Sequence, residues 1–171
     1  SSAGSGAAAP GKRSNPEPFM ILVICPNLGI DRILEVPHFR TAVVQRSTGV
    51  IRQPGGKGSN AARVLAHLKS PVALTGFVGR EDSAAVAGPL QDIGVETRLV
   101  EAFDGTSRNC TIIVDPSSAA HPTVINEESV PIEADAEERL MNVVGRQLPV
   151  CTAVLVTGSL AVGLKPSFYA R

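Results

Sequence analysis

A glycine-dense turn, Pro54–Asn60 (PGGKGSN), is the feature that most constrains this chain, because it runs directly into a helical pattern at 61–68. Adjacent glycines let the backbone approach a ligand closely, and the unpaired N–H groups of the helix's first turn point toward the same spot. The side chains of Lys57 and Asn60 add hydrogen-bond donors there. The turn predicts a site for an anion or for hydroxyl groups. The alternative is a helix start that needs glycines only for its geometry.

Two nucleotide-binding motifs can be tested against this turn. The phosphate loop G-x-x-x-x-G-K-[ST] fails, because Gly58 follows Lys57 and Ile51 stands where the first glycine belongs. The dinucleotide fingerprint G-x-G-x-x-G/A fits 56–61, but it should follow a buried parallel strand, and 49–54 is too polar for one. A dinucleotide-binding oxidoreductase therefore stays open only as a remote alternative.

Composition restricts the class of protein. A chain of 171 residues with 43% hydrophobic residues is long enough for one domain with a core. Because its formal net charge is zero, we expect no nucleic acid partner. No apolar run approaches the length of a membrane span, so we expect no membrane partner. The cysteines at positions 25, 110 and 151 lie far apart in apolar runs, which indicates reduced core residues of a cytoplasmic protein. The three histidines offer no ligand set for zinc.

The first 18 residues are small and polar, contain three prolines and lack the apolar stretch of a secretory signal. They predict a disordered tail at 1–18 ahead of one domain at 19–171. A transit-peptide remnant, with targeting to an organelle, and an expression leader both remain open for this tail.

Two kinds of apolar pattern alternate along the rest of the chain. Continuous apolar runs at 19–25, 72–78 and 152–156 predict strands buried on both faces of a parallel sheet, with helices near 59–69, 83–94 and 135–146. The segments at about 32–53 and 95–126 instead alternate apolar and polar residues, which predicts exposed antiparallel strands. The expected fold is an α/β layer that carries a small, separate antiparallel sheet.

Six short motifs occur in order along these predicted elements. They are Asn27-x-x-x-Asp31, Gly55-Gly56-Lys57-Gly58-x-Asn60-x-Ala62, Gly76-x-x-Gly79, Ser107-Arg108, Asn126-Glu127 and Gly158-Ser159-Leu160-x-x-Gly163. Together they resemble the N-terminal half of a PfkB (ribokinase-like) carbohydrate kinase, nearest to the 1-phosphofructokinase and tagatose-6-phosphate kinase type. The resemblance covers the chain from about Met20 to its last residue. Each motif is weak alone, but six in order make a specific signal.

The resemblance implies an ATP- and magnesium-dependent kinase that phosphorylates a hydroxyl of a hexose phosphate such as fructose 1-phosphate or tagatose 6-phosphate. In such a kinase the extra strands form a lid that closes over the sugar and pairs two subunits into a homodimer. Asp31 and Asn60 would bind hydroxyls, while Lys57 and Arg108 would face the phosphate. The substrate-binding residues implied by the resemblance are Asp31, Gly55, Gly56, Lys57, Asn60, Arg108 and Asn126.

The sequence also departs from the family. An aspartate, a glycine and a proline of the family pattern are replaced by Glu81, Ala85 and Ala161, respectively, and a glycine after the first helix is replaced by Lys69-Ser70. The usual Thr-Arg-x-Asn motif appears as Ser-Arg-Asn-Cys at 107–110, so Cys110 stands where the asparagine is usual. Family members are nearly twice this length, and the Gly-Ala-Gly-Asp loop with the catalytic base lies in their later half, with the nucleotide site. Nothing here matches that loop. We therefore expect no catalytic residue, no metal site and no bound ATP in this chain, and no activity in isolation. The alternative is a non-catalytic module that binds sugar phosphate or pairs through the lid.

Overall fold

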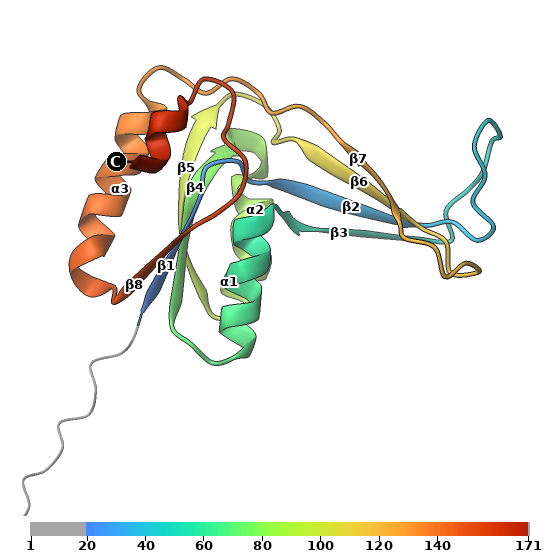
Figure 1. Cartoon of the computed structure of the whole chain (residues 1–171), viewed down its shortest axis with the longest axis horizontal. Coiled ribbons are helices and arrows are strands. Elements are labelled where there is room, and N and C mark those ends of the chain that lie inside the picture. Colours follow the sequence, from blue (N-terminus) through green and yellow to red (C-terminus); the bar gives the residue numbers. More distant parts are fainter. Residues whose placement is uncertain (1–19, 171) are drawn as a thin grey trace, which may run out of the picture.

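The structure is a computed structural model that describes residues 20–170, so the tail predicted at 1–18 lies outside the described residues. A four-stranded parallel sheet forms the central layer, in the order β5 (Val95–Phe103), β4 (Val72–Gly79), β1 (Ile21–Cys25), β8 (Ala153–Val156). Helices α1 (Lys57–His67) and α2 (Ser83–Gln91) lie on one face, and α3 (Ala136–Gln147) lies on the other (Figure 1). None of the helices within 20–170 is long and apolar enough to cross a bilayer.

Two apolar clusters hold the central layer together, one on each face of the sheet. Successive residues of β1 point to opposite faces, so Leu22 and Ile24 pack toward α3 while Val23 and Cys25 pack toward α1 and α2. Because both faces are covered, β1 and β4 are almost fully buried. This confirms the parallel layer predicted from the continuous apolar runs. The prediction that the run at 152–156 is buried on both faces is wrong, because β8 is an edge strand whose residues are mostly exposed.

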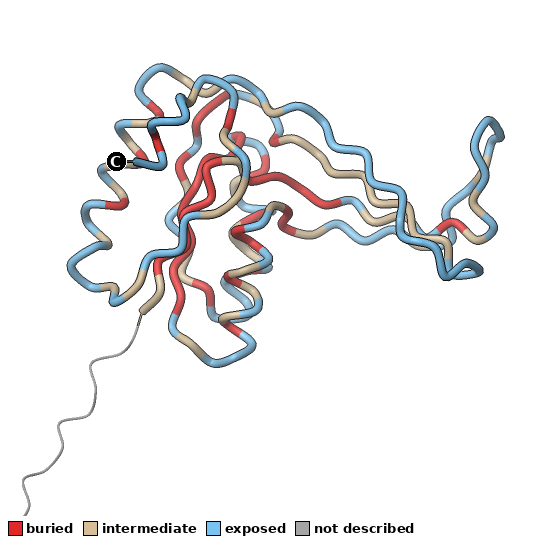
Figure 2. The backbone as a smooth tube through the Cα atoms, in the orientation of Figure 1, coloured by how far each residue is buried: buried red, intermediate tan, exposed pale blue. Residues whose placement is uncertain are grey.

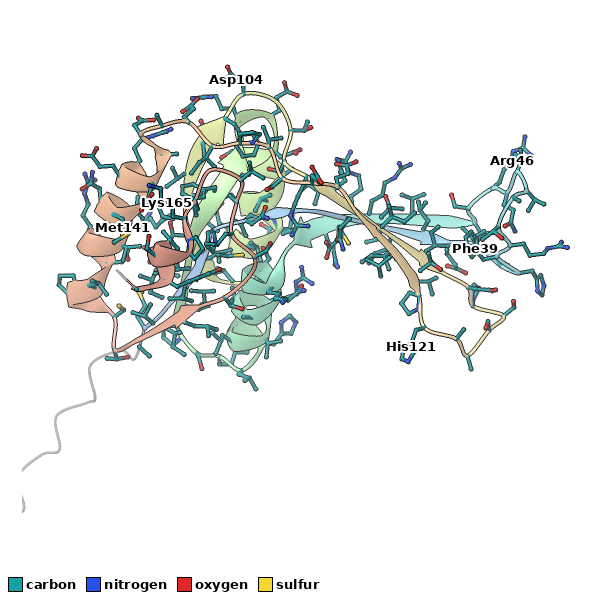
Figure 3. The ribbon with its side chains drawn as sticks, turned by 45° about the horizontal axis from the view of Figure 1, so that its top comes forward. Phe39, Arg46, Asp104, His121, Met141 and Lys165 are labelled. Atoms are coloured by element: carbon teal, nitrogen blue, oxygen red, sulfur yellow. The ribbon has the colours of Figure 1, made fainter. Side chains whose placement is uncertain are left out.

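A second four-stranded sheet projects from the central layer (Figure 1), and we call it the lid. Its order is β3 (Gly49–Gly55), β2 (Gly29–Glu35), β6 (Asn109–Val114), β7 (Thr123–Asn126). Most of its backbone is half-buried or exposed, in contrast to the buried central strands (Figure 2). The labelled residues Phe39, Arg46 and His121 lie at its far end, away from the central layer (Figure 3). The separate sheet predicted from the alternating segments is thus confirmed.

Two details of the predicted lid are wrong. The segment 95–103 is β5, which pairs in parallel with β4 at the edge of the central sheet and does not belong to the lid. An edge strand has a neighbour on one side only and keeps polar residues exposed, so its pattern resembles that of a lid strand. The lid is also not wholly antiparallel, since β2 and β6 pair in parallel. In the chain β2 follows β1 and β6 follows β5, and β1 and β5 are parallel. Both lid strands therefore run outward from the central layer in the same direction (Figure 1).

The end of α1 shows how one departure from the family pattern is accommodated. Lys69 takes a left-handed conformation with φ of 61° where a glycine is usual. The N–H of Lys69 donates to the carbonyl of Ala66, and the N–H of Ser70 donates to that of Leu65. These two bonds form the usual glycine-type helix ending with a lysine in the strained position.

Candidate functional site

A cavity of about 720 Å³ lies beyond the carboxyl ends of β1 and β8, where the lid meets the first turn of α1. Open α/β sheets bind ligands at this end of their strands, and the volume falls within the range usual for small-molecule sites. Among the lining residues are six of the seven predicted from the resemblance: Asp31, Gly56, Lys57, Asn60, Arg108 and Asn126. The fold therefore brings residues from the lid, α1 and the connections between them to one pocket.

The glycine turn places the start of α1 against this pocket. Gly56 has φ of 96°, and a Cβ atom there would lie 3.3 Å from the carbonyl oxygen of Asn27. Both the left-handed conformation and the close approach favour glycine at this position. The helix begins at Lys57, and the N–H of Asn60 donates to the carbonyl of Gly56 at 3.2 Å. The side chains of Lys57 and Asn60 therefore reach the pocket from the first helical turn.

Gly55 is the one predicted residue that does not line the pocket. A Cβ atom at Gly55 would lie 2.3 Å from Oδ1 of Asp31, so the glycine leaves room for that carboxylate to cross the neighbouring strand. Asp31 is only 9% exposed, and burial raises the pKa of its carboxyl group above the ordinary value. The guanidinium groups of Arg108 and Arg63 counteract this rise in pKa. Gly55 thus shapes the site through Asp31.

A row of three side chains crosses the lid at the pocket. Asp31, Cys110 and Asn126 are direct cross-strand partners on β2, β6 and β7, and all three line the cavity. Cys110 was predicted as a core residue, and this is wrong, because β6 is a lid strand with one face toward the pocket. Burial and the nearby Asp31 carboxylate raise the pKa of the Cys110 thiol, which is therefore protonated at neutral pH. The alternation of Cys110 with Ile112, which also lines the cavity, was the signal for this face.

Arg108 is held in the pocket by Asn27, which the sequence did not identify as a substrate-binding residue. Nε of Arg108 donates to Oδ1 of Asn27 at 3.1 Å, and Nδ2 of Asn27 donates to Oγ of Ser159 at 2.9 Å. These two hydrogen bonds link the connection between β5 and β6 to the end of β1 and to the loop after β8. Because a guanidinium has further N–H donors, Arg108 can still bind a ligand while Asn27 holds it.

The two cations of the pocket are available to an anion. Neither Lys57 nor Arg108 forms an ion pair with any residue in the part of the chain that the structure describes. Glu127 also lines the pocket, but its carboxylate accepts the backbone N–H of Asn109 at 2.7 Å and Nδ2 of Asn109 at 3.1 Å. These two bonds lower the pKa of Glu127. The geometry thus favours an anionic group between α1 and Arg108.

Comparison with known families decides the class of protein. The model of the family described as pfkB family carbohydrate kinase matches residues 22–166, which is most of the chain. The chain belongs to the pfkB family of carbohydrate kinases. The match spans the central layer, the lid and all of the residues that line the cavity.

Solved structures of other proteins share this fold. A Thermotoga maritima protein described as a possible 1-phosphofructokinase has a TM-score of 0.78 and 24% identity over 86% of this chain and 47% of its own. Phosphofructokinase-2 from Escherichia coli, in complex with fructose-6-phosphate, has a TM-score of 0.77 and 22% identity over 88% of this chain and 49% of its own. The chain therefore spans about half the length of the solved structures that it matches.

The pfkB family implies the use of ATP, usually with magnesium. Within 20–170 there is no group of three or more histidine, cysteine or acidic residues placed to hold a metal ion. The two unpaired cations of the pocket suit a single phosphate group, so we derive no step through ATP or magnesium. The remote dinucleotide alternative is also wrong. The strand before the glycine turn is β3, which pairs antiparallel with β2 in the lid, whereas the fingerprint requires a buried parallel strand.

Proposed function

We propose that the cavity binds a hexose monophosphate, as the sugar-binding part of a kinase that phosphorylates a hydroxyl of that sugar with ATP. One observation carries the proposal: Lys57 and Arg108, which come from α1 and from the connection between β5 and β6, line the same cavity without ion-pair partners among the described residues. Ammonium and guanidinium groups both form charge-assisted hydrogen bonds to phosphate.

The rest of the cavity is suited to the sugar. Asp31 offers carboxylate oxygens that accept hydrogen bonds from hydroxyl groups, and the amides of Asn60 and Asn126 both donate and accept. Asp31 and Asn126 approach from the lid, whereas Asn60 approaches from α1. We infer that the hydroxyl groups lie between the lid and α1, and that the lid closes over them.

Calorimetric titration of the chain with a panel of ligands tests this proposal. The panel contains fructose 1-phosphate, fructose 6-phosphate and tagatose 6-phosphate, with fructose and tagatose as matched controls that lack the phosphate. At least one hexose monophosphate is expected to bind about tenfold or more tightly than its parent hexose, because charge-assisted hydrogen bonds to phosphate are added. Equal affinity for every phosphorylated and unphosphorylated pair would contradict the proposal.

We also propose that this chain by itself binds the sugar phosphate without transferring a phosphoryl group. Transfer needs a nucleotide cradle and a group that accepts the proton of the attacking hydroxyl. By resemblance Asp31 belongs to the sugar, and the described residues hold no candidate metal cluster. With ATP, magnesium and the same panel, ADP release is expected to stay at the background rate. Turnover that survives removal of host kinases would contradict this and would also exclude the alternative of a non-catalytic module.

The lid supports a further proposal, that it pairs with a second copy of this chain. One apolar row crosses the four strands of the lid, because its members are direct cross-strand partners: Ile51 on β3, Ile33 on β2, Ile112 on β6 and Val124 on β7. Ile51 is 59% exposed and Val124 is 50% exposed. The matching Escherichia coli phosphofructokinase-2 is described in a tetrameric inhibited form. Burying the row against the same row of a second chain would remove this apolar surface from water.

Sedimentation velocity over a range of concentrations tests the pairing. The chain is expected to form dimers as its concentration rises, and Ile51→Lys, which places a charge at one end of the row, is expected to shift the population to monomer. Val64→Lys provides a matched control, since Val64 is also 59% exposed but lies on α1. A chain that stays monomeric at every concentration would contradict the pairing.

A further inference from the structure

A buried carboxylate lies outside the pocket, behind the connection from which Arg108 extends. Asp82 ends the short 3₁₀ turn Arg80–Asp82 and is 7% exposed. Asp82 directly precedes α2, but its side chain makes no cap hydrogen bond. Its Oδ2 instead accepts the backbone N–H of Ser107 at 2.8 Å. Asp82 forms no ion pair with any described residue, so the hydrogen bond from Ser107 is what compensates the burial of its carboxylate.

The same connection is tied to the end of β4 at further points. Oγ of Ser107, which is 1% exposed, accepts the N–H of Gly79 at 2.9 Å, and the N–H of Glu81 donates to the carbonyl of Gly105 at 3.2 Å. A Cβ atom at Gly79 would lie 2.4 Å from the carbonyl oxygen of Gly105. Asp104, at the outer end of this connection, lies at the margin of the central layer (Figure 3). The chain is therefore fixed just before Arg108, where it leaves the central layer for the lid.

Arg108 itself is held on its other sides by the residues around β1 and β2. Its carbonyl accepts the N–H of Ile30 at 3.0 Å, and a Cβ atom at Gly29 would lie 2.6 Å from that carbonyl oxygen. Its guanidinium donates to Asn27 at 3.1 Å. The backbone N–H of the preceding residue, Ser107, depends on Asp82. Without the bond to Asp82 the backbone at Ser107 can shift, and the guanidinium of the adjacent Arg108 shifts with it.

We propose that Asp82 is a positioning residue for Arg108: through the hydrogen bond to Ser107 it sets where the Arg108 guanidinium lies in the cavity. The proposal rests on the proposed function, because the guanidinium is assigned there to the phosphate of the ligand. Asp82 does not line the cavity, so its effect on a ligand passes through Arg108. Asp82 is therefore a determinant of the preference for phosphorylated over unphosphorylated sugar.

The test compares Asp82→Ala with Asp82→Asn, both titrated with the panel's tightest hexose monophosphate and with its parent hexose, at a temperature where every variant is folded. Alanine removes the hydrogen bond to Ser107, and the phosphorylated ligand is expected to bind about tenfold more weakly while the parent hexose changes by less than about twofold. Asparagine keeps an acceptor oxygen and is expected to restore the affinity. Asp104→Ala is the matched control, because the Asp104 side chain is 95% exposed in the same connection.

A double mutant separates positioning from general weakening of the fold. In an Arg108→Ala background, Asp82→Ala is expected to cause no further loss of affinity, because the group that Asp82 positions is gone. Equal weakening of both ligands by Asp82→Ala, failure of Asp82→Asn to restore binding, or an additional loss in the double mutant would each overturn the proposal.

A second measurement tests the positioning of Arg108 by Asp82 without relying on sugar binding. In the ¹⁵N NMR spectrum the Arg108 Nε–H resonance, which reports its bond to Asn27, is expected to shift or broaden in Asp82→Ala and to return in Asp82→Asn. If the wild-type chain shows no preference for phosphorylated sugars, the proposed function fails and this resonance alone decides the positioning. An Arg108 resonance that is unchanged in Asp82→Ala would overturn it.

Discussion

Replacing Lys57 with alanine is expected to weaken binding of the hexose monophosphate by about 10- to 100-fold, the equivalent of one lost hydrogen bond to a charged group. Lys57 extends from the first turn of α1 into the cavity and has no ion-pair partner in the described part of the chain. Its ammonium group is therefore available to the phosphate. Binding of the parent hexose is expected to change little, because its hydroxyl groups are assigned to Asp31 and Asn60.

Calorimetric titration of Lys57→Ala with both ligands measures this selectivity. Lys165→Ala provides the matched control, since it removes the same charge from an exposed position that does not line the cavity. The control should bind both ligands as the wild-type chain does. Equal losses of affinity for the hexose and its monophosphate in Lys57→Ala would show that Lys57 does not recognise phosphate.

Replacing Gly58 with alanine is expected to lower both the stability of the fold and the affinity of the cavity. The new Cβ atom would lie 2.3 Å from Cβ of Cys25 and 3.0 Å from its Sγ, where β1 ends beneath α1. Because Cys25 is fully buried, the start of α1 must move outward, and such overpacking costs about 1–3 kcal/mol in free energy of unfolding. Lys57 and Asn60 move with the helix, so the ligand loses contacts from both.

Gly145→Ala is the matched control for Gly58→Ala. Gly145 lies within α3, and a Cβ atom there meets no other atom within 4 Å. Alanine is the better helix former, so this variant is expected to raise the free energy of unfolding by about 0.5–1 kcal/mol. Urea denaturation monitored by circular dichroism measures both changes, and the two variants should differ in sign. A Gly58→Ala chain as stable as the wild type would contradict the tight contact between α1 and β1.

The central layer could be predicted from the sequence because its inner strands are buried on both faces. Such strands take apolar residues at nearly every position, and the runs at 21–25 and 72–78 show this directly, with Thr75 as the one hydroxyl-bearing residue. The edge strand β5 could not be assigned in the same way, since its exposed positions tolerate polar residues. The parallel pairing of β2 with β6 depends on the directions of β1 and β5, which a local pattern does not contain.

The candidate site was predictable in part, and chiefly through the family resemblance. The glycine turn alone predicts an anion or hydroxyl site at Lys57 and Asn60. Nothing in the local sequence says that Arg108 lies in the same cavity, because only the crossing from β5 to β6 brings it there. The prediction of Cys110 as a core residue is wrong because an apolar run around a cysteine does not show which face of the strand is covered. Nothing in the local sequence shows that Asp82 bonds to Ser107, because the two residues are distant in the chain.

Mapping of ¹⁵N NMR shifts as a hexose monophosphate is added shows whether the phosphate lies between Lys57 and Arg108. The largest shifts are expected in the backbone amides of 56–60 and in the Nε–H of Arg108, with smaller shifts at 56–60 and little change at Arg108 for the parent hexose. A second hollow lies on the lid and is lined by Arg32 and Arg52. Phosphate-dependent shifts confined to that hollow, with 56–60 and Arg108 unchanged, would contradict a phosphate site at Lys57 and Arg108.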